Sequence, residues 1–536
     1  MPLMGSLYIG NSALQTNQNS LNATAHNMAN SDTVGYVRQQ AYNTTNTYNT
    51  LKINADSVSN FEVGTGVVYA ETRQIRDYFL DLSYRRESGR SAFYETSFSA
   101  MEEVEIILGE LNQVAFQQSL EDLVGSVQEL SKEPAGSVQQ GLFIQSCNAF
   151  LMRSKSVYEG LCNYQDNTNT NIKLMVDKIN DYGKQIKTLN DHIRYIETAG
   201  IEQANDLRDA RAQLVDELSG MGKIEVQELE TGAITVKFEG ENFVQDDVAY
   251  EIGVKTDSTT GFYTPFWTQN TPYTLSDTGE KVYDPSKTGK VFDIEQLIST
   301  ENNTDIGQLK AMIFTRGEKR GDYTDLINEE KYDAQISQSV IVNIQAEFDG
   351  LVNAVTTMIN DVVKRNTAEG FEVFTRISGY TGAPEEGQNP GVGVITDTLY
   401  ATHNLQMNQE LVEQPTKLKF RNEADGEAFA ALEELKKGFE AEDYRLNPNV
   451  LNKTNIMKYY DALVGQISNS GNVYKNIADH QSDVVSATEY QRQSILGVST
   501  EEELSNMVRF QNGYNAASRY INVISEMLEH LINKLG

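Results

Sequence analysis

The side chains that most often carry chemistry in proteins are scattered in this sequence. Cys147 and Cys162 are its two cysteines and have no CxxC spacing, and its five histidines form no HExxH pattern. No GxxxxGK[ST] loop, GxGxxG turn or GxSxG elbow occurs, and acidic pairs such as Glu102 and Glu103 are typical of solvated faces. We therefore expect no catalytic residue, no metal site and no cofactor, and we expect the two thiols to be free and buried.

Two further features could bind a partner, but each has a simpler explanation. Residues 320–322 spell the adhesion tripeptide RGD, which arises often by chance in a chain of this length. Trp267 follows Phe262, Tyr263 and Phe266, and could belong to an aromatic platform for a ligand. Because aromatic clusters in strands more often belong to the core, we expect Trp267 to be buried.

The composition describes a folded, acidic chain of more than one domain. The 536 residues are 39% hydrophobic and 22% charged, which is the range of globular proteins. The balance of 44 basic and 76 acidic residues gives a net charge of -32, which repels nucleic acid and anionic lipid. Neither a run of about 18 apolar residues nor a secretory signal is apparent, so we expect no membrane insertion and no cleaved leader.

The first thirty residues carry a helical heptad pattern with almost no charge. The apolar positions of the pattern are Leu7, Leu14, Leu21 and Met28. Through residue 50 the formal charges are Asp32 and Arg38. The spacing predicts a helix with a narrow apolar seam and a polar, neutral outer face.

The last part of the chain carries a second, longer seam. Ser499 and Thr500, followed by Glu502 and Glu503, form overlapping capping boxes that predict the start of a helix. The seam then alternates steps of three and four through Met507, Phe510, Tyr514, Ala517, Ile521, Ile524, Leu528, Leu531 and Leu535. Such a helix needs a partner, because most of its stability comes from burying the stripe.

We expect the two terminal helices to pair with each other, although each could instead pack separately on the body of the protein. A neutral outer face is unusual for a solvated coiled coil, and it favours packing against copies of the same chain.

The fold class expected is mainly α with a smaller β part, in which the paired terminal helices join a long helical bundle and an inserted, strand-rich and outer part. Helical periodicity covers residues 81–220, 332–363 and 455–493, and a period of two covers residues 223–291. The domains expected are a terminal-helix assembly domain (1–60 and 498–536), a helical bundle (61–222, 330–365 and 450–497), a strand-rich segment (223–329) and an inserted outer domain (366–449).

The segment ANSDTVGYVRQQ after the first seam resembles the signature of the flagellar rod, hook and hook-associated proteins. The matching residues are Asn30, Thr33, Gly35, Tyr36 and Arg38. Asn30 is expected to end the helix in a left-handed turn, Gly35 to permit a tight reversal, and Tyr36 and Arg38 to anchor the following extended chain. The carboxy-terminal segment from residue 499 is similar to the matching end of the same family.

A segment in the middle of the chain resembles only some members of this family. NDLRDARAQLVDELS, with Asp209 and Arg211, is similar to a helix found in the members of that family that join hook and filament. The resemblance covers about half of the chain and does not include residues 366–448.

The resemblance implies a structural subunit of the extracellular flagellum at the junction between hook and filament, secreted by the flagellar type III apparatus. Its implied partners are copies of itself, the hook protein, the second junction protein and an export chaperone at the carboxy-terminal helix. The two seams and the signature residues above are then the expected assembly contacts. A rod or hook subunit, and a secreted adhesin or enzyme with a flagellar-type export end, stay open as alternatives.

Overall fold

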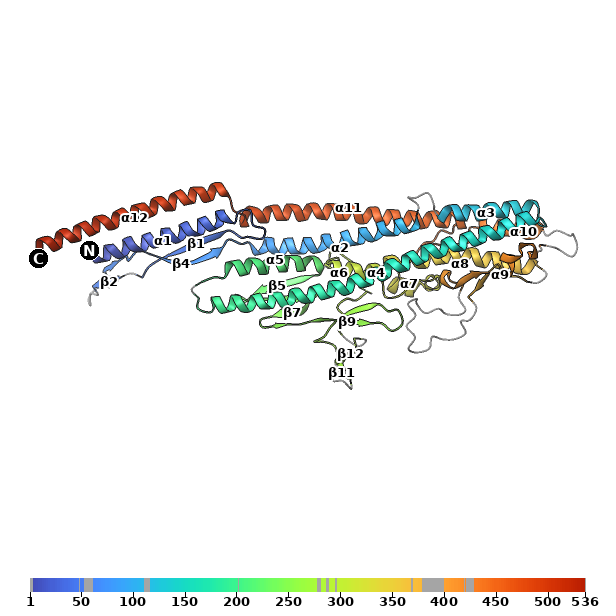
Figure 1. Ribbon diagram of the computed structural model, residues 1–536, viewed down its shortest axis with the longest axis horizontal. Coiled ribbons are helices and arrows are strands. Elements are labelled where there is room, and N and C mark those ends of the chain that lie inside the picture. The colour runs from blue at the N-terminus through green and yellow to red at the C-terminus, as the bar shows by residue number, and fades with distance from the viewer. Residues whose placement is uncertain are drawn as a thin grey trace.

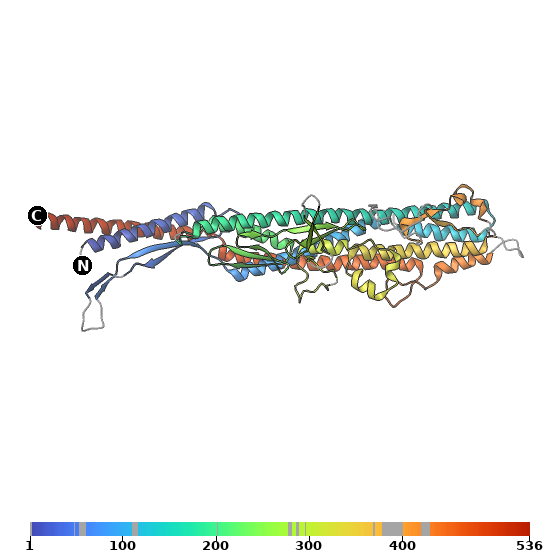
Figure 2. The same ribbon diagram turned by 90° about the horizontal axis from the view of Figure 1, so that it is seen from below.

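The protein is a long rod with both chain ends at one tip (Figure 1, Figure 2). The computed structural model describes residues 3–535 except 48, 53–60, 110–115, 201, 277–280, 286–288, 295, 368–369, 378–399, 419 and 421–428. Helices dominate the described residues, and the strands form small antiparallel sheets. The expected fold class, mainly α with a smaller β part, is confirmed.

The two terminal helices form the tip that holds the chain ends. Helix α1 (Leu3–Ala29) lies against α12 (Thr500–Leu535), and α12 extends beyond the start of α1 (Figure 1). A ribbon of β1 (Gln39–Thr45) and β4 (Val67–Gln74) packs beside α1, and β2 (Asn49–Lys52) pairs with β3 (Phe61–Val63) further along the ribbon. The expected pairing of the terminal helices is therefore confirmed.

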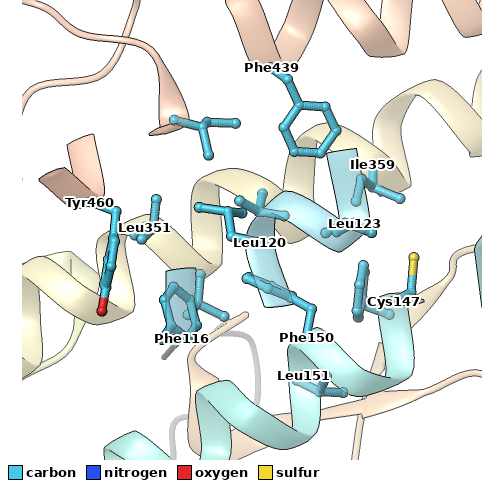
Figure 3. Close-up of a cluster of buried hydrophobic side chains, with 14 of the residues drawn as sticks. Phe116, Leu120, Leu123, Cys147, Phe150, Leu151, Leu351, Ile359, Phe439 and Tyr460 are labelled. Carbon is cyan, nitrogen blue, oxygen red and sulfur yellow. The ribbon is translucent and has the colours of Figure 1, made fainter. Parts of the chain in front are cut away.

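The body of the rod begins with two long helices that run alongside each other, α2 (Tyr78–Leu108) and α11 (Ile456–Leu496). At its far end they join α3 (Phe116–Lys132), α4 (Ser137–Glu197) and α8 (Val340–Asn366) around the larger hydrophobic core. Phe116 lies at the centre of this core, with its ring centroid 4.9 Å from that of Phe348 and 5.0 Å from that of Tyr460. Figure 3 shows how aromatic and aliphatic side chains from these helices meet there.

The described part of residues 366–449 packs into the same core. Its elements are β13 (Phe374–Arg376), η3 (Thr402–Asn404), β14 (Leu405–Met407), α9 (Gln409–Glu413), η4 (Pro415–Lys417) and α10 (Phe429–Glu440). Phe374, Leu411 and Phe439 are buried among the bundle side chains. These elements are too short to bury a core of their own, which is why they extend the bundle.

A second core lies nearer the terminal helices. One face of α4 packs there against α5 (Asn205–Met221), α6 (Gln308–Arg316) and the strand-rich segment. Strands β5 (Ile224–Glu228), β6 (Ile234–Phe238), β7 (Glu241–Gln245) and β8 (Val248–Ala249) form one sheet in that order, β9 (Ile252–Thr256) pairs with β10 (Tyr263–Trp267), and β11 (Tyr273–Leu275) pairs with β12 (Lys281–Tyr283). The period of two holds, since Ile234, Val236 and Phe238 all point into the core.

The helical pattern expected over residues 332–363 contains a break. Helix α7 (Glu329–Gln335) follows the short η2 (Tyr323–Leu326) and ends before Ile336, and α8 begins only at Val340. Ile336 is nonetheless buried, in a small cluster with Tyr332 and Val342. The apolar spacing continues across the break because α7 and α8 both face this cluster.

Candidate assembly interface

Helix α1 meets α12 through small side chains. A Cβ atom added to Gly10 would lie 2.7 Å from Cγ1 of Ile521, and one added to Gly513 would lie 2.4 Å from Oδ1 of Asn17. The order of these contacts shows that the helices run antiparallel. Other buried positions of α1 are Ser6, Thr16, Ser20, Thr24 and Asn27. The predicted seam of α1 is only half-buried in the single chain, at Leu7, Leu14, Leu21 and Met28.

The predicted seam of α12 follows the face turned to α1. Ala517 and Ile524 are buried, each 7% exposed. The half-buried members are Met507, Phe510, Tyr514, Ile521 and Leu528. Leu531 is 41% exposed, since α12 passes the start of α1 near this point (Figure 1). The side chain of Leu535 lies outside the described residues.

A second apolar row on α12 is exposed. Tyr520, Val523 and Met527 follow each other at steps of three and four, and each is between 41% and 51% exposed. Because α-helical residues advance by about 100°, this row runs beside the seam and not through it. Leu504 and Val508 are exposed nearer the start of the helix.

The signature segment is held by an asparagine that precedes it. Nδ2 of Asn27 donates to the backbone oxygen of Gln39 at 2.8 Å, and its Oδ1 accepts from the amide of Gln39 at 2.9 Å. The same Oδ1 accepts from the hydroxyl of Tyr36 at 2.8 Å. The hydroxyl of Tyr36 also lies 3.0 Å from Nδ1 of His26. One buried amide thus fixes the direction in which β1 leaves α1.

The turn between α1 and β1 differs in one respect from expectation. Gly35 has φ 80°, a left-handed conformation that glycine adopts without strain. Asn30 does not have a positive φ, so the expected left-handed exit there is wrong. Instead, Nδ2 of Asn30 donates to the backbone oxygen of His26, and its Oδ1 accepts from Thr33 at 3.3 Å. The side chain satisfies the helix end without a left-handed residue.

Arg38 joins the signature to the start of α12. Its Nε donates to Oε1 of Glu503 at 2.8 Å, and its Nη2 donates to Oε1 of Glu502 at 2.8 Å. The amide of Arg38 also donates to the backbone oxygen of Leu496, the last residue of α11. Burial alone lowers the pKa of Arg38, but the hydrogen bonds that Arg38 donates to Glu502 and Glu503 outweigh it and raise that pKa.

Asp209 ties the ribbon to the bundle. Its Oδ2 accepts from the amide of Val37 at 3.2 Å, and its Oδ1 accepts from Nε2 of Gln74 at 2.6 Å. Burial raises the pKa of Asp209 to about 7, against the opposing effects of the Val37 amide and the charge of Arg76. One carboxylate of α5 therefore holds the chain before β1 and the last residue of β4 together, at the end of the ribbon nearest the bundle.

Behind this joint lies a buried ion network that holds α11 to α2 and α5. Arg492 donates to Asp81 at 2.7 Å and to Asp216 at 2.5 Å. Arg76 donates to Asp81, and Arg85 donates to Asp216. Burial raises the pKa of Asp81, but the charges of Arg76 and Arg492 outweigh burial and lower it.

The sequence did not indicate the contacts of Asn27 or the exposed row of α12, and it indicated Asp209 only through a family resemblance. Asn27 gives no signal of its own, because a helical asparagine more often faces solvent. The row could have been found from the steps 520, 523 and 527. Glu502 and Glu503 were expected to cap α12, whereas their carboxylates bind Arg38.

The cysteines, Trp267 and the RGD tripeptide all have structural contacts within the described residues. Cys147 and Cys162 are free and buried, and Trp267 packs in the second core, as expected. Arg320 of the RGD tripeptide is bound to Asp166 at 2.9 Å, and its side chain is 9% exposed. No group of three or more His, Cys, Asp and Glu side chains in the described part of the chain could hold a metal ion.

None of the helices in the described ranges is both long and apolar enough to span a bilayer.

Two protein-family models match parts of this chain. Residues 101–370, half of the chain, match the model of the flagellar hook-associated protein FlgK helical domain. Residues 7–36, which include most of α1 and the signature turn, match the model of the flagella basal body rod protein.

Similar proteins were found along nearly the whole chain. The flagellar hook-associated protein 1 of Bacillus subtilis strain 168 is 25% identical, over 98% of this chain and 97% of that protein. The Escherichia coli K12 protein of the same name is 23% identical, over 97% and 98%. A solved structure of the flagellar hook junction protein FlgK from Burkholderia pseudomallei is 14% identical, over 56% of this chain and 47% of that one, with a TM-score of 0.41.

The match to the helical domain over half of the chain, together with the rod-protein match at α1, shows that the chain belongs to the FlgK family of flagellar hook-associated proteins, the structural subunits of the junction between hook and filament.

Proposed function

We propose that the chain forms the junction by packing copies of itself through α12, between the hook protein on one side and the second junction protein on the other. The observation that supports this most is the exposed row of Tyr520, Val523 and Met527 on α12. Apolar rows of this kind mark protein interfaces, since their exposure to water is unfavourable.

The outer face of α1 fits the same arrangement. Its exposed residues include Asn11, Gln15, Gln18 and Asn22, and the helix carries no formal charge from an acidic or basic side chain other than histidine. Neutral amide side chains allow close packing of many like copies, because charges on this face would repel one another around a ring. The predicted seam residues of α1 and the signature residues are proposed to be buried further in this packing.

The proposal for export rests on the last turns of α12, which extend beyond the start of α1. Leu528 and Leu531 lie where α12 passes the start of α1, and Ile532 is exposed beside them. An export chaperone that binds this end would cover the apolar surface until secretion through the flagellar type III apparatus. Assembly then replaces the chaperone with neighbouring subunits.

We also propose a separate role for each range of residues along the rod. Residues 1–60 and 498–536 are assigned to assembly, the helical ranges 61–222, 330–365 and 450–497 to the rigid body, 223–329 to the strand-rich side, and 366–449 to its outer end. The support is that α1 and α12 contact each other while α2 and α11 contact each other. Limited proteolysis of the purified chain should cut first near the boundaries of these ranges.

The assembly role is tested by adding charge to the exposed row. Val523→Asp with Met527→Asp should leave the chain folded but abolish its incorporation, because carboxylates would be desolvated in the contact. Asn522→Asp adds a carboxylate to an exposed position outside the row and is the matched control. In the native bacterium we expect hooks without filaments and unpolymerised flagellin in the medium for the double variant, by electron microscopy and immunoblotting. Normal filaments would contradict the proposal.

The chaperone is tested separately. Deleting residues 529–535 should remove binding of the export chaperone from the same bacterium, measured by calorimetry with the two purified proteins. The seam turned to α1 is retained as far as Leu528, so the circular dichroism of the deleted chain should stay helical. Unchanged affinity would contradict the role of this end in export.

A further inference from the structure

A groove lies between the first turns of α2 and the edge strand β5. It has a volume of about 300 Å³. Its main lining residues are Phe79, Leu82 and Arg86 from α2, Ile224 and Val226 from β5, and Lys223, which directly precedes β5. Phe79 is 74% exposed and Leu82 is 51% exposed, although both are large apolar side chains. The hydroxyl of Tyr78 donates to Oε2 of Glu228 at 2.7 Å and fixes α2 to β5 at one end of the groove.

The other side of α2 is occupied by α11. Asp81 accepts from Nε of Arg492 at 2.7 Å, and the guanidinium of Arg492 lies 4.7 Å from the ring centroid of Tyr84. Since each helical residue advances by about 100°, Phe79 points about 200° away from Asp81. The groove therefore opens on the side of α2 that is opposite to α11.

Tyr490 occupies the corresponding outer side of α11. It lies two residues before Arg492, so it points about 200° away from α2. It is 79% exposed, and no other aromatic side chain of α11 is as exposed within the described residues. Because Arg492 contacts Asp81, Tyr490 also lies at the same height along the rod as Phe79 and Leu82. The chain thus presents an apolar groove on one side and an aromatic knob on the other, at one level.

We propose that Tyr490 of one copy inserts into the groove between α2 and β5 of the next copy. This inference rests on the proposed assembly of the chain with itself and names a contact in the body of the rod, between α2, β5 and α11 and not between the terminal helices. Copies that stand side by side and close into a ring make head-to-tail contacts. Such a contact requires two different faces of the chain at the same level along the rod, as the groove and Tyr490 are. Tyrosine is also a frequent anchor residue in pockets at protein interfaces.

The charges around the two faces are complementary. Arg86 and Lys223 line the groove, in a chain whose net charge is -32; Nε of Arg86 binds Glu87 at 2.8 Å, and 53% of the Arg86 side chain is exposed. Asp483 lies seven residues before Tyr490 and therefore on the same face of α11, about 10 Å away. Helices α2 and α11 run in opposite directions, so Asp483 lies toward the end of the groove that holds Arg86. Placing a carboxylate near these cations relieves the repulsion that acidic copies would otherwise experience.

The inference is tested by cross-linking in intact flagella. Leu82→Cys combined with Tyr490→Cys should give, after oxidation, a ladder of covalent oligomers of this chain. Each single variant should give no ladder, because a head-to-tail contact brings together two different residues. Tyr490→Cys with Tyr195→Cys is the matched control, since Tyr195 is 86% exposed at the end of α4 and is not part of the contact. Ser83→Cys with Ala487→Cys provides a second pair across the same contact.

The readouts separate this contact from the proposed function. Filaments on the hooks report that the chain assembles, and the ladder reports the contact. Normal filaments without a ladder from either pair would overturn the inference and leave the assembly role intact. If the cysteine pairs themselves prevent filament growth, exchanging the charges of Arg86 and Asp483 tests the same contact. Arg86→Asp and Asp483→Arg should each reduce the fraction of cells with filaments, and the two together should restore it. An unrestored double variant would overturn the inference.

Discussion

Nε of Arg38 donates a hydrogen bond to Oε1 of Glu503 at 2.8 Å, and this contact joins the turn after α1 to the first turn of α12. The Glu503 side chain is 3% exposed, and that of Arg38 is 17% exposed. A second carboxylate, Glu502, binds the same guanidinium but is 56% exposed. The paired terminal helices are therefore tied at their base by a largely buried ion pair.

Replacing Arg38 by methionine should loosen this base. Glu503 would be left buried without its cation, which costs about 3–5 kcal/mol in comparable pairs. We expect faster amide hydrogen exchange over the first turns of α12, measured by mass spectrometry. Glu502→Gln is the control and should change stability by about 0–1 kcal/mol, because the Glu502 carboxylate is exposed. Equal exchange in the Arg38 variant and the unmodified chain would show that the ion pair does not hold the joint.

Gly10 should tolerate no large side chain. A Cβ at this position would lie 2.7 Å from Ile521, so Gly10→Leu forces α1 and α12 apart at a cost of about 1–3 kcal/mol. Gly5→Leu is the matched control, because nothing lies within 4 Å of a Cβ at Gly5. Both changes gain the same helix propensity, so the difference between their urea midpoints reports the contact. No difference would place the two helices further apart than described.

The pH dependence of stability should include a contribution from Asp209. Its pKa is about 7 in the folded chain and about 3.9 when unfolded, so folding favours the protonated carboxyl. Its contribution to stability is present below about pH 4 and is lost as the pH rises through 7. Asp209→Asn removes this titration. The free energy of unfolding of the variant, relative to that of the unmodified chain, should rise between pH 5 and pH 8 in urea titrations; a flat difference would contradict the assignment.

The two thiols should report unfolding. Cys147 is fully buried and Cys162 is 6% exposed, and burial raises the pKa of both thiols. Because the thiolate is the reactive form, a maleimide should label neither residue at pH 7 in the folded chain and both in urea. The labelling rate against urea concentration should follow the circular dichroism of the bundle. Rapid labelling without urea would indicate that the larger core opens locally.

Periodicity in the sequence was sufficient to predict the long helices and the strand-rich segment. Steps of three and four predicted the helical region now seen as α4 and the face of α12 that meets α1, because burial of one face imposes a period on the sequence. The same argument did not predict which positions of α1 are buried in the single chain, where the predicted seam is half-buried. The buried positions there include Ser6, Gly10 and Asn27, and small or polar residues give no hydrophobic period.

The sequence also contained signals with more than one physical meaning. An acidic residue three positions after Ser499 predicts a capping box, yet the carboxylate of Glu502 reaches Arg38 across 464 positions of sequence. Asn30 was expected to adopt a left-handed backbone, but its side chain bonds the preceding turn instead. The Glu502 side chain took a partner far away in the sequence, which spacing cannot indicate, and the Asn30 side chain took a second local partner that the residue type also allows.

The sequence by itself determined the helical framework, the acidic surface and the signature that places the chain in its family, since these depend on local patterns and composition. Only the tertiary structure decided that the described part of 366–449 shares the bundle core, that Asp209 holds the ribbon, and that Tyr490 lies level with the groove beside Leu82. These relations join residues far apart in the chain, and their energies arise from packing and desolvation that no local pattern records.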